Sequence, residues 1–72
     1  MPRYFFDYAD DTRVLDRSGT EFPRLADAEH HARIIAAELA RDVPDHELHE
    51  AFIVVVDSDA KEVFRVALAH LQ

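Results

Sequence analysis

The spacing of apolar residues between positions 25 and 39 is the feature that most constrains the fold of this chain. These residues recur three and four positions apart, which places them on one face of an α-helix. They are Leu25, Ala28, Ala32, Ile35 and Leu39. Pro44 disfavours helical geometry at the residue before it, so the helix is expected to end near Asp42.

Two strand-like segments precede this helix and two follow it. Residues 3–8 are rich in aromatic side chains, and the shorter segment 12–16 follows a polar turn. After the helix, the β-branched segment 51–56 and the segment 62–68 flank an Asp-Ser-Asp turn. The order ββαββ predicts an α+β fold, with a four-stranded, largely antiparallel sheet and one helix packed on one face. A chain of 72 residues has room for one core, so residues 1–72 are expected to form a single domain.

The third strand is apolar on both sides, although one helix covers only one face of a sheet. The residues expected to face the helix are Phe6, Tyr8, Ile53, Val55, Phe64 and Val66. The residues expected on the opposite face are Phe5, Phe52, Val54, Val56 and Val63. Because an apolar patch on a small protein usually marks an interface, these five residues predict self-association, most simply as a dimer. The alternatives are that segment 69–72 shields them, or that they are spread too thinly to form a patch.

The charge balance argues against several classes of partner. Fifteen acidic residues against eight basic ones give a net charge of −7, and the basic residues are scattered singly, so binding to nucleic acid is not expected. The absence of cysteine excludes disulfides, thiolate nucleophiles and cysteine-ligated zinc. No signal peptide or membrane-spanning run is recognisable, so we expect no membrane association and a cytoplasmic location.

The candidate chemical groups do not form a recognisable catalytic or cofactor site. His30 and His31 are adjacent on the helix and point about 100° apart, so we interpret both as surface residues. His46 and His49 are three apart in segment 45–50, whereas a helical zinc protease motif needs a spacing of four, so we expect a solvated loop without bound metal. The turn at 57–59 lacks the later glycine and glutamate of a calcium loop. The sequence therefore predicts neither an enzyme nor a bound cofactor or metal.

Three features of the sequence resemble a bacterial family of short proteins that share a domain of unknown function. They are the opening Met-Pro-Arg-Tyr-Phe-Phe, the segment Asp16-x-x-Gly19-Thr20-Glu21-Phe22-Pro23 before an alanine-rich helix, and a strand that ends at Asp57 before a turn and a final apolar strand. The match runs over nearly the whole chain. The resemblance implies a compact ββαββ domain, cytoplasmic and often encoded alone, with no established activity.

The sequence departs from the family pattern at three positions. Arg24 replaces a frequent acidic helix cap, Ala51 replaces an aromatic residue, and Ala60 replaces a glycine in the last turn. The residues support three hypotheses in this order: a module that dimerises or docks on another protein through its apolar sheet face, an acidic, antitoxin-like binder of a basic protein, and a metal-dependent or hydrolytic enzyme.

Overall fold

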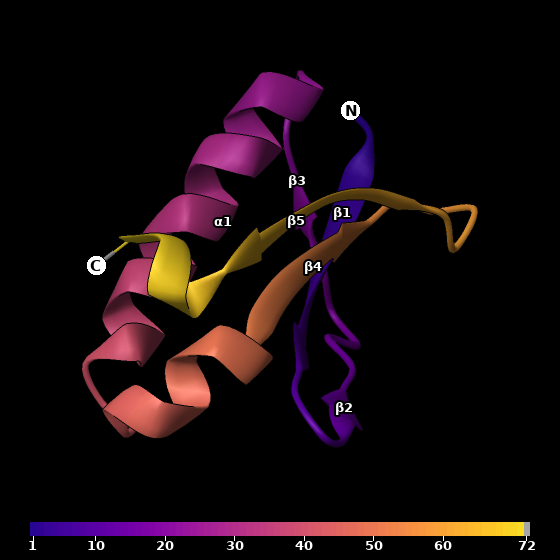
Figure 1. The fold of residues 1–72 in the computed structure, drawn as a ribbon. Coiled ribbons are helices and arrows are strands. Elements are labelled where there is room, and N and C mark those ends of the chain that lie inside the picture. Colours follow the sequence, from indigo (N-terminus) through magenta and orange to yellow (C-terminus); the bar gives the residue numbers. More distant parts are fainter. Residues whose placement is uncertain (72) are drawn as a thin grey trace.

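The computed structural model describes residues 1–71, which form an antiparallel sheet of five strands with one α-helix against one face (Figure 1). The predicted α+β class, with one helix on an antiparallel sheet, is confirmed. The short strand β3 was not predicted. The elements are β1 (Arg3–Ala9), β2 (Arg13–Val14), β3 (Thr20–Glu21), α1 (Leu25–Ala40), β4 (Phe52–Val56) and β5 (Glu62–Ala67).

Strand β1 lies in the middle of the sheet and is paired along both of its edges. On one edge it pairs with β4, from Phe5 opposite Val56 to Ala9 opposite Phe52. On the other edge, β3 pairs with the beginning of β1 and β2 pairs with its end. Between these two short strands the chain leaves the ladder, and the Asp16 carboxylate accepts the Phe6 backbone N–H at 3.1 Å in place of a strand carbonyl. The predicted second strand, 12–16, is therefore reduced to two residues.

Strands β4 and β5 form the second predicted hairpin, and the Asp57 side chain organises its turn. One oxygen of this carboxylate accepts the backbone N–H groups of Asp59 and Lys61 at 2.9 and 3.0 Å. Ala60 adopts φ = 65°, a left-handed conformation that glycine reaches without steric cost. The interpretation of this segment as a hairpin turn is confirmed.

Helix α1 packs on the sheet through a row of alanines. Ala28, Ala32, Ala36 and Ala40 follow one another at intervals of four and are all buried. Alanine has the smallest apolar side chain, so the helix axis can approach the strands closely. Leu25, which the apolar spacing placed on the same helical face, opens the first turn and is 37% exposed.

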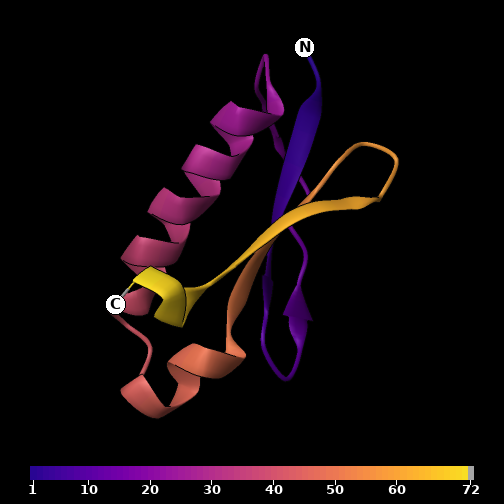
Figure 2. The same cartoon turned by 45° about the horizontal axis from the view of Figure 1, so that its top comes forward.

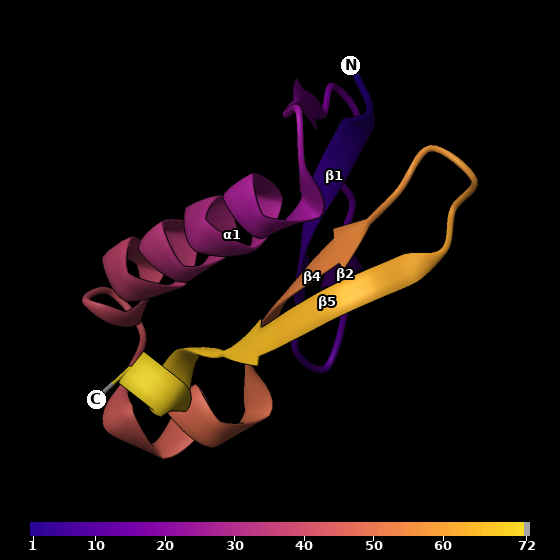
Figure 3. The ribbon, with the colours of Figure 1, turned by 90° about the horizontal axis from the view of Figure 1, so that it is seen from above.

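Two 3₁₀ helices lie at one end of the sheet, on the same side as α1 (Figures 2 and 3). They are η1 (Asp45–Glu50) and η2 (Leu68–Leu71). Sequence patterns predicted a solvated loop for the first segment, but Leu48 inserts into the core with only 4% of its surface exposed. Leu68 was predicted to end a strand, yet it begins η2, where its N–H donates to the Ala51 carbonyl at 3.0 Å.

The C-terminal segment does not cover the opposite face of the sheet. Helix η2 packs beside α1, as Figures 1 and 2 show. The alternative in which segment 69–72 shields the apolar residues of that face is therefore wrong for the part that the structure describes. Residue 72 lies outside the described residues. The sheet thus has one face under α1 and one face without a covering helix in the described chain.

Candidate functional site: the open sheet face

We define the open face as the side chains of the sheet that point away from α1. Register and alternation place them on all five strands and on the residue that follows β2. They are Arg3, Phe5, Asp7 and Ala9 of β1, Arg13 of β2 and the following Leu15, Glu21 of β3, Phe52, Val54 and Val56 of β4, and Glu62, Arg65 and Ala67 of β5. Four of the five residues predicted for this face are among them.

Val63 is the fifth predicted residue, and it lies elsewhere. Val55 pairs with Phe64 while Val56 pairs with Glu62, so Val63 is an extra residue in β5 and forms a β-bulge. The bulge interrupts the alternation of side chains, and Val63 packs against the core on the helix side. The placement of Val63 on the open face was therefore wrong, because strict alternation does not allow for an inserted residue.

Two ion pairs lie among the apolar side chains of the open face. The Arg13 guanidinium donates to Asp7 with Nη2 3.0 Å from Oδ2, and Arg65 binds both oxygens of Glu62 at 3.0 Å. The Arg65 guanidinium carbon also lies 5.1 Å from the centre of the Phe52 ring. Hydrogen bonding from Arg65 lowers the pKa of Glu62. Charged groups therefore share the face with the apolar ones.

Val54 shows the effect of this mixture on exposure. It has no exposed surface although no helix covers it, and its neighbours across the strands are Asp7 and Arg65. Phe5, Phe52 and Val56 are half-buried. The apolar surface of the open face is thus divided into smaller areas around Val54, which solvent does not reach.

Asp7 and Asp16 hold the edge of this face in place. Asp7 is only 5% exposed, and besides Arg13 it accepts the backbone N–H of Asp16 at 3.0 Å. The Asp16 carboxylate in turn accepts N–H groups from Phe6, Ser18 and Gly19, each at 3.1 Å. Burial raises the pKa of Asp16, but these backbone hydrogen bonds outweigh burial and leave the pKa below its usual value. Both carboxylates therefore stabilise the chain's own backbone.

A hollow of about 540 Å³ lies on the open face between β2 and the turn of the second hairpin. Phe5 and Val56 contribute apolar surface to it. The remaining lining residues are Asp7, Arg13, Leu15 and Asp16 on one side and Asp57, Ser58, Ala60 and Glu62 on the other. Four carboxylates accompany a single guanidinium, so the lining carries an excess of negative charge.

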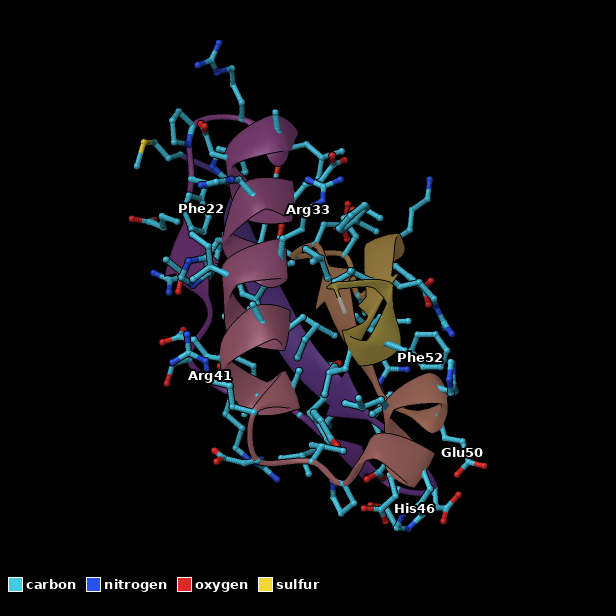
Figure 4. All side chains as sticks on the ribbon, turned by 60° about the vertical axis from the view of Figure 1, so that its left-hand side comes forward. Phe22, Arg33, Arg41, His46, Glu50 and Phe52 are labelled. Carbon is cyan, nitrogen blue, oxygen red and sulfur yellow. The ribbon has the colours of Figure 1, made fainter. Side chains whose placement is uncertain are left out.

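His30 and His31, which lie on α1, do not contribute to the open face. His30 is exposed, as predicted, but His31 is partly buried between Phe6 and Phe22, with ring centres 5.0 and 5.2 Å away. The interpretation of His31 as a surface residue was therefore wrong. In Figure 4, Phe22 lies on one flank of α1 and Arg33 on the other, where Arg33 covers the ring of Phe64 at 5.0 Å.

His46 and His49 are both exposed on η1, and Figure 4 shows His46 and Glu50 extending outward from it. Residues three apart share one side of a 3₁₀ helix. Within residues 1–71, no group of three or more histidine, aspartate or glutamate side chains is placed to hold a metal ion. None of the helices described there is long and apolar enough to cross a membrane.

Comparison with known proteins identifies one family. The model of a family described as a domain of unknown function (DUF6894) matches residues 3–69, which is nearly the entire chain. Comparison with curated proteins and with solved structures gave no match.

Proposed function

We propose that the chain, which belongs to the DUF6894 family, is a non-enzymatic interaction module that pairs with a second copy of itself through the open face. The observation that carries this proposal is a sheet face that no helix of the described chain covers, with Phe5, Phe52 and Val56 half-buried on it. Antiparallel sheets bury such a face efficiently against a second sheet, about 10 Å away.

The distribution of charge supports contact between two identical faces. Two copies that each carry a net charge of −7 repel one another over most of their surface. The open face includes the acidic hollow, but Arg13 and Arg65 also stand there, beside Asp7 and Glu62. A two-fold axis through this face can bring arginines of one copy next to carboxylates of the other. Such contacts reduce the electrostatic opposition to association at this face.

Sedimentation velocity over micromolar to millimolar concentration tests the proposal, and we expect a reversible shift from 8.3 kDa to twice that mass. Phe52→Ser should weaken the dimer at least about tenfold, since truncation of an aromatic side chain buried in an interface often costs more than 1 kcal/mol. A wild-type chain that sediments as a monomer throughout would overturn the proposal.

The chain offers a matched control for this variant. Phe64 is also half-buried beneath an arginine, Arg33, but it lies on the helix side of the sheet. Phe64→Ser should reduce the free energy of unfolding while leaving the dissociation constant of the folded dimer unchanged. Equal weakening of the dimer by both variants would point to a general loss of stability.

A second candidate function rests on the end of the molecule formed by η1 and the first hairpin. Four carboxylates surround a small cleft there, from Asp10, Asp11, Glu47 and Glu50. Burial raises the pKa of the neighbouring Tyr8, and Asp10 and Glu47 raise it further. This acidic end favours a regulatory role as a binder of a basic protein.

The two functions make different predictions for the oligomeric state of the purified chain and for the proteins recovered with it from the cell. A basic protein recovered with the chain from its native cell in near-equal amounts, and lost with the pair Asp10→Asn and Glu47→Gln, would support the acidic binder. Recovery of that protein by a chain that stays monomeric would favour this second function over the first.

A further inference from the structure

We propose that the two copies interlock, with Leu15 of each copy inserted into the hollow of the other. This inference rests on the proposed dimer and specifies how its two faces fit. Disulfide trapping and sedimentation together distinguish failure of the interlock from failure of the dimer itself.

Leu15 is the protruding part of the fit. It is 57% exposed and lies just after β2, two residues beyond Arg13, so both side chains point toward the open face. The other large exposed apolar side chains of the described residues are elsewhere: Met1 at the N-terminus, Leu25 and Ile34 on α1, and Val14 on the opposite side of β2. Leu15 is therefore the exposed apolar side chain that this face offers to a partner.

The hollow is the receiving part of the fit. It is a shallow, open depression with a volume of about 540 Å³, and Phe5 and Val56 give it apolar surface. The chain's own Leu15 stands at its margin and keeps more than half of its surface in solvent. A leucine entering from a second copy would bury apolar surface on both sides of the contact.

The charge of the hollow's lining also favours the segment that carries Leu15 as the part of the second copy that enters the hollow. Because carboxylates outnumber guanidinium groups in the lining, an entering segment should bring both an apolar and a positively charged side chain. The segment formed by β2 and the residue after it brings Leu15 together with Arg13. Arg13 uses Nε and Nη2 to bind Asp7, and its Nη1 has no hydrogen-bond partner among the described residues. That nitrogen is available to Asp57 or Glu62 at the margin of the second copy's hollow.

Two-fold symmetry produces the contact between Leu15 and the hollow twice, once in each direction between the copies. An interface between identical faces needs a protrusion and a cavity within one patch, and Leu15 and the hollow are adjacent on the open face. One rotation therefore places both leucines at once.

Disulfide trapping tests this geometry directly, because the natural chain has no cysteine. A Leu15→Cys protein carrying a size tag is mixed with an untagged Ser58→Cys protein under mild oxidation, so that a mixed product can form only between copies. We expect this mixed disulfide to be the main product, since Ser58 lines the hollow. The control replaces Leu15→Cys with Ile34→Cys, an exposed position on α1, and should give little product.

Two further outcomes of trapping contradict the interlock. If Leu15→Cys links to itself and gives no product with Ser58→Cys, the two leucines meet on the axis and neither enters a hollow. If Ile34→Cys links to Ser58→Cys as readily as Leu15→Cys does, the products report random collision.

Sedimentation of Leu15→Ser provides an independent measurement. We expect the dimer dissociation constant to rise at least about tenfold, while Leu25→Ser, an equivalent change on exposed α1, leaves it unchanged. Circular dichroism confirms that each variant is folded. A dimer that Phe52→Ser weakens and Leu15→Ser does not would overturn the interlock and leave the open face as the interface. A monomeric wild-type chain would overturn both.

Discussion

At the scale of single residues, two positions have a left-handed backbone conformation. One is occupied by a glycine, which adopts it without steric cost, and the other by an alanine, which does not. Gly19 has φ = 71° and Ala60 has φ = 65°. Gly19 also lies close to its neighbours, since an added Cβ would lie 2.8 Å from the Phe5 ring and 2.9 Å from the Arg3 side chain. Its N–H donates to Asp16. The motif Asp16-x-x-Gly19 thus joins a hydrogen bond, a left-handed turn and a close packing contact.

We predict that Gly19→Ala destabilises the fold by about 1–3 kcal/mol, because the methyl group adds steric strain to an unfavourable φ. Urea denaturation measures the change. Ala60→Gly is the comparison variant, and its effect on stability should not be destabilising. It should be neutral or stabilise by up to about 1 kcal/mol, since relief of the left-handed strain offsets the greater flexibility of glycine. A Gly19→Ala protein as stable as the wild type would contradict the account of this turn.

The Asp16 carboxylate gives the fold a dependence on pH. Its pKa in the folded chain is below the ordinary value of about 3.9, so its stabilising contribution is complete above that value and is lost as pH falls through the lower folded value. Asp16→Asn should cost about 1–2 kcal/mol at neutral pH, because charge-assisted hydrogen bonds are replaced by weaker ones. The difference from the wild type should shrink below about pH 4.

Urea denaturation of both proteins between neutral and acidic pH checks this prediction. Asp11→Asn, at an exposed position in the first hairpin, serves as the control and should change stability by less than about 0.5 kcal/mol. A difference between Asp16→Asn and wild type that stays constant with pH would show that the charge of Asp16 is not the cause.

At the scale of secondary structure, α1 begins without a side-chain cap. Its N-cap residue, Arg24, has the extended backbone conformation of a capping residue (φ −142°, ψ 152°), and its carbonyl accepts the Asp27 N–H at 3.1 Å, but its side chain accepts no hydrogen bond from the first turn. It makes only an exposed ion pair with Asp27 at 3.8 Å, which contributes little. The missing side-chain cap therefore leaves the first turn less stable.

We predict that Arg24→Ser stabilises the chain by about 0.5–1.5 kcal/mol, because serine can accept an N–H of the first turn. Thermal unfolding followed by circular dichroism measures the gain. Arg17→Ser, another exposed arginine that lies outside any helix, provides the comparison and should not raise the melting temperature. A fall in stability for Arg24→Ser would mean that the Arg24–Asp27 pair outweighs the missing cap.

At the scale of the whole molecule, charge is unevenly distributed. The hollow of the open face has four carboxylates beside one guanidinium, and the end formed by η1 and the first hairpin carries four neighbouring carboxylates. Much of the excess of acidic residues, 15 against 8 basic ones, is therefore gathered in these two places. Repulsion among these acidic groups opposes folding of the compact chain.

We predict that raising ionic strength from about 0.01 M to about 0.15 M increases the free energy of unfolding by up to about 1 kcal/mol, because salt screens this repulsion. Denaturation at one low protein concentration avoids a contribution from dimer formation. The variant Asp11→Asn with Glu47→Gln should respond less to salt than the wild type. Stability that falls with added salt would indicate that the surface ion pairs outweigh the repulsion.

Local patterns predicted most of the elements and part of the candidate site. The helix follows from the spacing of Ala28, Ala32 and Ile35, and alternation in the third strand placed Phe52, Val54 and Val56 on one side. Alternation failed at Val63, because an inserted residue in one strand becomes visible only when its partner strand is known. His31 was misplaced for a similar reason, since Phe6 and Phe22 reach it from distant parts of the chain.

The sequence by itself determined the α+β class, the helix and both hairpins. It also determined that one strand is apolar on both sides, although a single helix covers only one face of the sheet. These properties depend on residues within a few positions of one another, whose spacing sets helical or strand periodicity. Only the tertiary structure decided that β1 lies between β4 and two short strands, that Asp16 replaces a strand carbonyl, and that a hollow opens between β2 and the second hairpin turn. Each of these depends on the register of segments far apart in the chain, which no local pattern encodes.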